Sequence, residues 1–121
     1  MKKQIILLIP LIMLIAAVSG FSQENMTQLY DSAFKSHLRP PAVFQHDRHN
    51  DQAKIFDCGV CHHLYEKGKK VEGATSEDRK CSECHYKDDD MSLASAYHNR
   101  CKGCHSEKKA GPILCGECHR K

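Results

Sequence analysis

The chain has 121 residues and eight cysteines, and the arrangement of these cysteines constrains its fold more than any other feature. They occur as four pairs with two residues inside each pair, and a histidine directly follows the second cysteine every time. The four motifs span Cys58–His62, Cys81–His85, Cys101–His105 and Cys115–His119. With nine histidines in the chain, the probability of this pattern by chance is on the order of 3 × 10⁻⁵. The motif is therefore a chemical unit that the chain repeats four times.

The C-x-x-C-H spacing is typical of covalent c-type haem attachment. On one helical turn both cysteines face the same side, so each can form a thioether with a porphyrin vinyl group while the histidine binds the iron. We expect four c-type haems, attached through Cys58, Cys61, Cys81, Cys84, Cys101, Cys104, Cys115 and Cys118. Zinc or iron–sulfur ligation is the main alternative, because two C-x-x-C pairs can bind a metal without any histidine. A disulfide scaffold is another alternative in an exported chain. The histidine after every pair favours haem over both.

The first twenty residues have the pattern of a secretory signal peptide, with Lys2 and Lys3 before an apolar run over residues 5–18. The run is short for a bilayer span, and an uncleaved anchor is the alternative to cleavage near residue 20. The expected organisation is a signal peptide over 1–20, an N-terminal extension over 21–40 and a tetrahaem cytochrome domain over 41–121. Because c-type haem is attached outside the cytoplasm, we expect a periplasmic protein.

Composition then indicates what fills the interior. Only 27 apolar residues other than cysteine remain among residues 21–121, which is little material for a core. Four haems, each a large and mostly apolar disc, would replace it. We therefore expect a small, mostly irregular multihaem cytochrome with a few short α-helices, little β-structure and the haem cluster as its core. A helix is expected over about 91–104, opened by the acidic residues 88–90, and a hairpin-like or irregular loop over 64–80.

The remaining histidines bear on what the haems can do. Four haems have eight axial positions, and the motif histidines fill four of them. Five other histidines are available: His37, His46, His49, His63 and His98. His63 directly follows His62, so it cannot reach the opposite face of the same haem, and His98 lies one turn before Cys101. Both must therefore serve a neighbouring haem, while a solvated side chain is the favoured interpretation of His37.

Residues 43–49, followed by the first motif and His63, resemble the start of the class III tetrahaem cytochromes c, the cytochrome c3 family. The resemblance covers roughly residues 41–119. It implies the following axial pairs: His46 with His62 on the first haem, His63 with His85 on the second, His49 with His105 on the third, and His98 with His119 on the fourth. It also implies that Phe44 packs between haems, although an ordinary buried aromatic residue is an equal alternative.

The chain departs from the common members of that family at two places. They often have four residues between the cysteines of the second and fourth motifs, whereas all four gaps here have two. His98 is also unusually close to Cys101, and residues 96–105 with Gly111-Pro112 are more similar to the type II, membrane-complex-linked subgroup. Direct transfer of the common type's partner surface is therefore in doubt.

Histidine on both faces of every iron would leave no position for a substrate, so the expected chemistry is one-electron transfer at low potential, without enzymatic activity. The resemblance implies an electron carrier between a periplasmic hydrogenase, or another multihaem cytochrome, and a membrane-bound redox complex. The alternative is a terminal multihaem reductase of metal ions or another small oxidant.

Charge bears on the partners. Without Lys2 and Lys3, 16 basic residues face 15 acidic ones, which excludes nucleic-acid binding by bulk charge. We expect a monomer that contacts membranes only through a partner protein. Basic residues gather in two patches: Lys67, Lys69 and Lys70, and then Lys102, Lys108, Lys109, Arg120 and Lys121. Each patch is either an ordinary solvated face or, for the second, a docking site for an acidic partner.

Overall fold

The computed structural model describes residues 26–85 and 91–121. The expected signal peptide and the acidic residues 88–90 lie outside these ranges. In chain order the elements are β1 (Gln28–Leu29), β2 (Ala42–Val43), α2 (His46–Ala53), the 3₁₀-helix η2 (Cys58–Val60), β3 (His63–Glu66), β4 (Lys69–Thr75), α3 (Cys81–His85), α4 (Leu93–Lys108) and α5 (Cys115–Cys118). Among the described residues, none of the helices combines the length and apolarity that a bilayer crossing requires.

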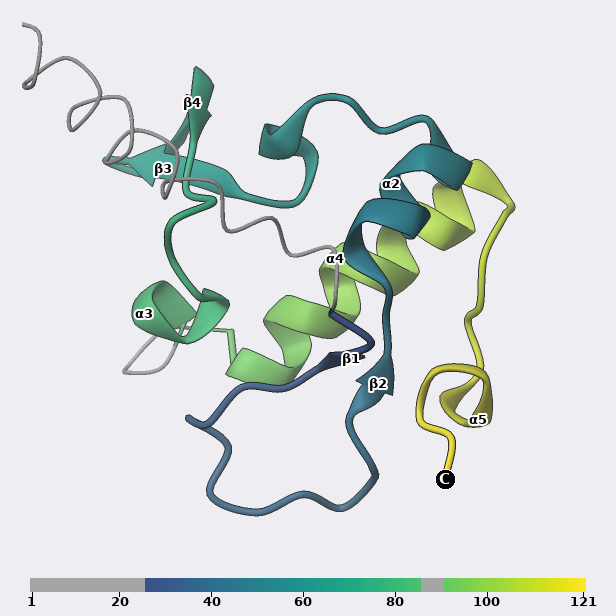
Figure 1. Ribbon diagram of the computed structural model, residues 1–121. Coiled ribbons are helices and arrows are strands. Elements are labelled where there is room, and N and C mark those ends of the chain that lie inside the picture. The colour runs from purple at the N-terminus through teal and green to yellow at the C-terminus, as the bar shows by residue number, and fades with distance from the viewer. Residues whose placement is uncertain (1–25, 86–90) are drawn as a thin grey trace, which may run out of the picture.

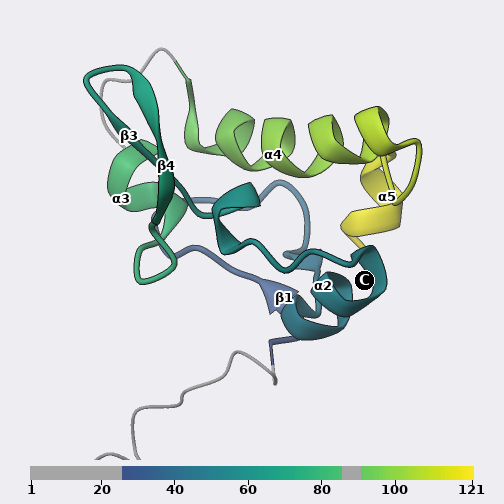
Figure 2. The ribbon, with the colours of Figure 1, turned by 90° about the horizontal axis from the view of Figure 1, so that it is seen from above.

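The elements surround the middle of the molecule without forming layers (Figure 1). Helix α4 runs along one side, and α2 and β1 lie on the opposite side (Figure 2). The β3–β4 hairpin and α5 lie toward opposite ends of the molecule, as both views show. Each cysteine motif begins in a helical segment, namely η2, α3, the long helix α4 and α5. The short helices and two small sheets confirm the expected fold class.

The longest helix, α4, begins and ends at recognisable caps. The Ser92 side chain accepts a hydrogen bond from the Ser95 N–H at 3.2 Å, as an N-cap residue does. At the other end Lys109 adopts a left-handed conformation with φ of 51°, and its N–H caps the last turn. The helix expected over about 91–104 is therefore confirmed, and it continues four residues further than expected.

The segment expected to be a hairpin or an irregular loop is an antiparallel hairpin with an irregularity. Its two-residue loop, Lys67-Gly68, has φ values of 49° and 77°, and positive φ at both central residues is what a type I′ turn requires. Glu66 pairs with Lys69, and the register shifts between His63 and Tyr65. The hairpin places His63 at its base, where the strand leaves the first motif.

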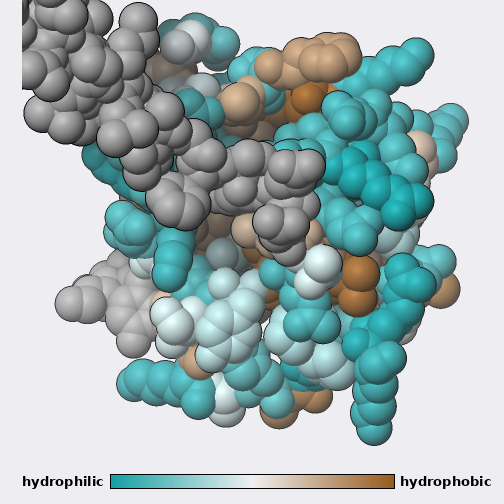
Figure 3. All heavy atoms as spheres, viewed as in Figure 1, coloured by the Kyte–Doolittle hydropathy of each residue, from teal (hydrophilic) through white to brown (hydrophobic). Residues whose placement is uncertain are grey.

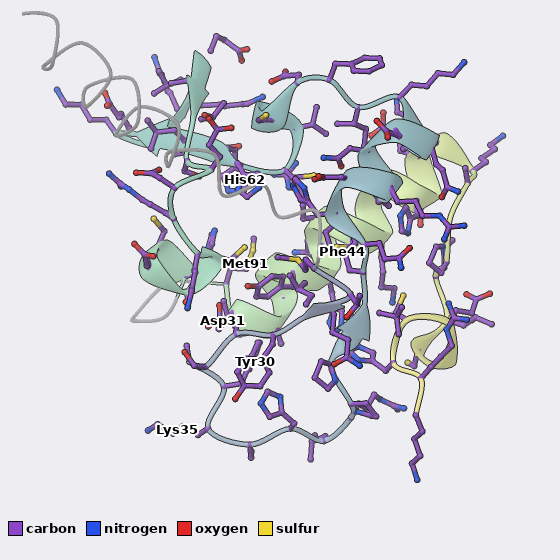
Figure 4. The ribbon with its side chains drawn as sticks, in the orientation of Figure 1. Tyr30, Asp31, Lys35, Phe44, His62 and Met91 are labelled. Atoms are coloured by element: carbon purple, nitrogen blue, oxygen red, sulfur yellow. The ribbon has the colours of Figure 1, made fainter. Side chains whose placement is uncertain are left out.

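The N-terminal segment is joined to the rest of the fold through β1, which pairs with β2. Asp31 is only 4% exposed. Its carboxylate accepts hydrogen bonds from the Ala33 N–H at 3.0 Å and from the Tyr97 hydroxyl of α4 at 2.9 Å. Figure 4 shows Asp31 beside the N-terminal part of α4. The described part of the expected extension therefore packs against the domain and contains a strand and turns.

Side-chain burial is low throughout the described ranges. Among the described residues, Leu93 is the buried apolar side chain, at 8% exposure, and Asp31 is the buried polar side chain. The face in Figure 3 is largely hydrophilic, with apolar residues in several separate places. Large apolar side chains such as Leu38 and Phe56 are 100% and 86% exposed. The polypeptide by itself thus has almost no hydrophobic core, as the composition indicates.

Substitution of Asp31 tests how the N-terminal segment is held. Burial alone would raise the pKa of Asp31, but hydrogen bonds from Ala33, Ser82 and Tyr97 and the charge of Lys80 bring that pKa below its usual value. Asp31→Asn leaves one donor without an acceptor, so we expect a loss of about 1–3 kcal/mol in the free energy of unfolding. Chemical denaturation of the haem-loaded protein measures this loss.

The same substitution has a pH dependence of known sign. Because the folded-state pKa is lowered, the carboxylate stabilises the fold at neutral pH, and this contribution disappears as the pH falls through the folded-state pKa. The difference between wild type and Asp31→Asn should therefore shrink in acid. Asp51→Asn, at an exposed carboxylate, is the control. Equal losses for the two variants, or a difference independent of pH, would contradict the role given to Asp31.

Candidate functional site

Eight of the nine histidines form four close pairs of imidazole rings. The ring centres of His46 and His62 are 6.3 Å apart, those of His63 and His85 6.0 Å, those of His49 and His105 6.1 Å, and those of His98 and His119 6.2 Å. Each pair joins one motif histidine to one histidine outside the motifs. These are the pairs that the family resemblance implies, while their ligation of iron stays a prediction.

The separation within the pairs suits an iron atom between the two rings. A metal–imidazole bond is about 2 Å long, and the ligating nitrogen lies about 1 Å from its ring centre, so two ligands on opposite faces place their ring centres about 6 Å apart. The ring-centre separations of all four pairs are close to this value. Aromatic rings in direct contact cover about 4.5–7 Å, so what indicates iron is that all four pairs have nearly the same separation and that each joins a motif histidine to a histidine outside the motifs. The residues therefore fit haem iron bound from both sides.

Helix α2 positions two of these histidines three residues apart, so that both lie on one side of the helix. Its His46 pairs with the first motif and its His49 with the third. The ring centre of Phe44, just before the helix, lies 6.1 Å from that of His46 and 5.1 Å from that of His49, in the region labelled in Figure 4. One short helix thus joins two of the proposed haem positions.

Helix α4 has a similar role at the C-terminal side. It carries His98 and, seven residues later, His105 of the third motif. His98 pairs with His119, which follows α5 near the end of the chain. The second motif occupies α3, and its His85 pairs with His63 of the hairpin. Every pair therefore joins two different segments of the chain.

Hydrogen bonds at Nδ1 orient several of these rings. The Nδ1 of His105 lies 2.7 Å from the Pro112 carbonyl oxygen, and that of His119 lies 2.7 Å from the Pro40 carbonyl oxygen. The Nδ1 of His46 lies 2.6 Å from the Asp47 carboxylate. Metal-binding histidines typically donate the N–H of the second ring nitrogen to such oxygens. These contacts leave Nε2 of each ring for the iron.

His63 has a different partner. Its Nδ1 lies 2.8 Å from a guanidinium nitrogen of Arg100, which also donates to the Val60 carbonyl oxygen at 3.0 Å. Burial lowers the pKa of His63, and the positive charge of Arg100 lowers it further. The second pair therefore has a cation beside one of its rings.

None of the eight cysteines, all of which lie in the described ranges, forms a disulfide, and six of them are exposed. Partial desolvation raises the pKa of Cys101 to about 11, and interactions with Cys61, Cys118 and Cys81 add to the rise. Thiols from all four motifs are thus near enough to interact electrostatically. The attachment points of the four motifs therefore converge on one region.

The zinc and iron–sulfur alternatives require three or more ligands around one point. Within residues 26–85 and 91–121, no group of three or more histidine, cysteine, aspartate or glutamate side chains is arranged to hold a metal ion.

His37 lies outside the four pairs. Its ring centre is 5.4 Å from that of Tyr30 and 5.9 Å from that of Phe34.

Comparison with known proteins identifies the family. The family model of the class III cytochrome c family matches residues 22–119. The chain belongs to this family. It carries four c-type haems, and its eight cysteines fit four attachment motifs. The match begins before residue 41, so it includes most of the segment that we expected to be an extension.

The chain is similar to several individual cytochromes c3 and c7. A cytochrome c3 from Desulfovibrio desulfuricans is 33% identical over 92 residues, which cover 69% of this chain and 81% of the relative. A cytochrome c7 from Geobacter metallireducens is 35% identical over 79 residues, or 64% of this chain and 62% of the relative. A cytochrome c7 from Geobacter sulfurreducens with a solved structure is 32% identical, with 71% of this chain and 92% of that chain covered and a TM-score of 0.37.

Three site features were not found from the sequence: Arg100 beside His63, the Asp31–Tyr97 hydrogen bond, and the close approach of Gly111 to His105. A Cβ atom at Gly111 would lie 2.6 Å from the His105 ring, and φ at Gly111 is +89°. The Gly111-Pro112 pair could have indicated a turn after the third motif. It does not indicate that the Pro112 carbonyl oxygen contacts the ring of His105, seven residues earlier in the sequence.

Gly111→Ala tests this support. The added methyl group clashes with the His105 ring and strains the backbone, so the ring must move away from its place opposite His49. We expect one of the four haems to gain a high-spin ferric fraction, which visible and electron paramagnetic resonance spectra detect. Gly103→Ala is the control, because nothing lies within 4 Å of a Cβ there. Low-spin spectra for both variants would refute the role of Gly111.

Proposed function

We propose that the chain is a periplasmic, low-potential electron carrier whose four haems are each bound by two imidazoles. The observation that carries the proposal is the opposition of the four ring pairs at 6.0–6.3 Å. The family match supports the coarser statement that the protein is a multihaem electron carrier. The axial ligands are those of the four pairs, and the thioether bonds are made by the eight motif cysteines.

Two imidazoles on every iron make the protein a carrier and not an enzyme. When bound, c-type haem supplies one-electron redox chemistry. Chemistry at the iron needs an open or weakly held position, and the two histidines of each pair would together hold the iron and leave no such position. Electrons then enter and leave only through the haem edges. This arrangement favours the electron carrier over a terminal reductase that binds its oxidant at iron.

The same ligands support low reduction potentials. Methionine as an axial ligand raises the potential of a haem. Met91 is one of the methionines in the described ranges. Its side chain is 39% exposed, and its sulfur lies 3.8 Å from the Asn99 amide nitrogen. The resemblance adds the partners that we propose: a hydrogenase or another multihaem cytochrome on one side and a membrane-bound redox complex on the other. The similarity to the type II subgroup, with the signal-peptide pattern, supports a periplasmic place beside such a complex.

His46→Met tests the ligation. Replacement of one of the two imidazoles on the first haem by a thioether should raise the potential of that haem alone. A redox titration followed by visible spectroscopy records one component at higher potential, together with the weak absorption band of methionine-bound ferric haem. His37→Met is the matched control, since His37 lies outside the pairs. Unchanged potentials in His46→Met, or equal changes in both variants, would contradict the proposed ligands.

Charge reversal tests the docking surface. Lys102 and Lys109 lie at the third motif and at the end of α4, close to the last two haem positions. If this patch steers an acidic partner, Lys102→Glu with Lys109→Glu should slow electron exchange with a hydrogenase, and added salt should slow the wild type. Lys69→Glu with Lys70→Glu, on the hairpin, is the control.

Stopped-flow mixing measures these rates. Equal rates for the two double variants, or a wild-type rate independent of salt, would refute the docking surface. The same instrument compares hydrogenase with soluble ferric complexes. Fast reduction by hydrogenase with negligible ferric turnover supports the carrier, whereas rapid ferric turnover supports the terminal reductase.

A further inference from the structure

Arg100 joins the start of the third motif to two residues in and beside the first motif. It lies in α4 directly before Cys101 of the third motif. Its guanidinium donates to the carbonyl oxygen of Val60, inside the first motif, at 3.0 Å, and contacts Nδ1 of His63, the proposed ligand of the second haem, at 2.8 Å. These partners lie 40 and 37 residues away in the sequence. Arg100 is therefore placed where it can act on more than one haem site.

The contact with His63 differs in sign from those of the other ring pairs. Arginine has five donors and no acceptor, and it remains charged at all physiological pH values. A neutral histidine that binds iron through Nε2 carries its proton on Nδ1, so Arg100 would act on His63 as a neighbouring positive charge and not as a hydrogen-bond donor. The Nδ1 atoms of His46, His105 and His119 instead lie beside oxygen atoms, and the oxygen beside His46 belongs to a carboxylate. The four sites therefore share a pair of imidazoles but differ in the charge beside them.

This difference in charge changes the reduction potential of the haem iron. Reduction adds one electron to the iron and removes one positive charge from it. A fixed positive charge beside the ligand destabilises the ferric state more than the ferrous state, and a carboxylate does the opposite. Contacts of this kind outside the first coordination sphere are known to tune the potential of a bound metal.

We propose that Arg100 raises the reduction potential of the second haem, held between His63 and His85, through the positive charge that it places beside His63. Asp47 acts in the opposite direction on the first haem through His46. The inference rests on the proposed axial pairs and extends them, because it assigns to named residues the difference in potential between chemically identical sites. The second haem is thereby favoured as a holding site for electrons.

Three variants separate the charge from the structural contact. Arg100→Gln removes the charge and keeps a donor for the Val60 carbonyl oxygen, whereas Arg100→Lys keeps the charge. Lys102→Gln removes one positive charge from the same helix two residues further along, and Lys102 is exposed. Nuclear magnetic resonance redox titrations resolve the methyl groups of individual haems, so each variant yields four separate shifts.

We expect Arg100→Gln to lower the equilibrium constant for reduction of the second haem by roughly tenfold, which is 59 mV for one electron. Solvent screening at the exposed guanidinium limits the effect to this size. Arg100→Lys should restore most of the potential, and Lys102→Gln should not single out the second haem. A second haem that is unshifted in Arg100→Gln, or shifted equally in Arg100→Gln and Lys102→Gln, would overturn the proposal.

A measurement on the wild type covers the case in which Arg100→Gln fails to take up four haems. The guanidinium protons of Arg100 should show paramagnetic shifts that follow the oxidation of the second haem, and an absence of such shifts overturns the proposal. The proposed function is tested separately by the low-spin spectra of all four haems. Low-spin spectra with no selective shift refute the role of Arg100 alone, whereas a high-spin haem in the wild type refutes the ligation on which it rests.

Discussion

Opposition of two imidazoles across about 6 Å is the interaction on which the rest of this molecule depends. Each pair joins a motif histidine to a segment elsewhere in the chain, so with iron bound as proposed the four pairs would act as four cross-links. Helix α2 contributes to the first and third pairs, and α4 to the third and fourth. The order of these cross-links along the chain explains why helices this short hold a defined arrangement.

The low burial of the polypeptide has the same origin. With Leu93 as the buried apolar side chain of the described ranges, hydrophobic packing between protein groups alone provides little stability. The apolar faces of four haems supply what the side chains do not. Hydrogen bonds between residues far apart in the sequence also hold the segments together. Examples are Asp31 with Tyr97 and His119 with the Pro40 carbonyl oxygen.

The sequence was informative wherever chemistry is carried by local spacing. The four motifs predict short helical segments and haem, the apolar and turn pattern over 64–80 predicts the β3–β4 hairpin, and the Met91–Cys104 stretch predicts α4. What it did not predict depends on contacts between distant segments. From the sequence, Arg100 looks like an ordinary surface cation. Nothing in the residues around it indicates that His63, 37 residues away in the sequence, lies 2.8 Å from its guanidinium. Asp31 likewise reads as part of a polar extension, because the Tyr97 hydroxyl that accounts for its burial comes from another segment.

Helix α4 also has a kinetic consequence. His98 and His105 stand seven residues apart on one continuous helix, a rise of about 10 Å at 1.5 Å per residue. With His98 and His105 as the proposed ligands, this helix would set the spacing of the two residues that hold the third and fourth irons. Because electron tunnelling weakens steeply with distance, a helical spacer of this kind would keep the transfer rate between the two proposed centres nearly constant.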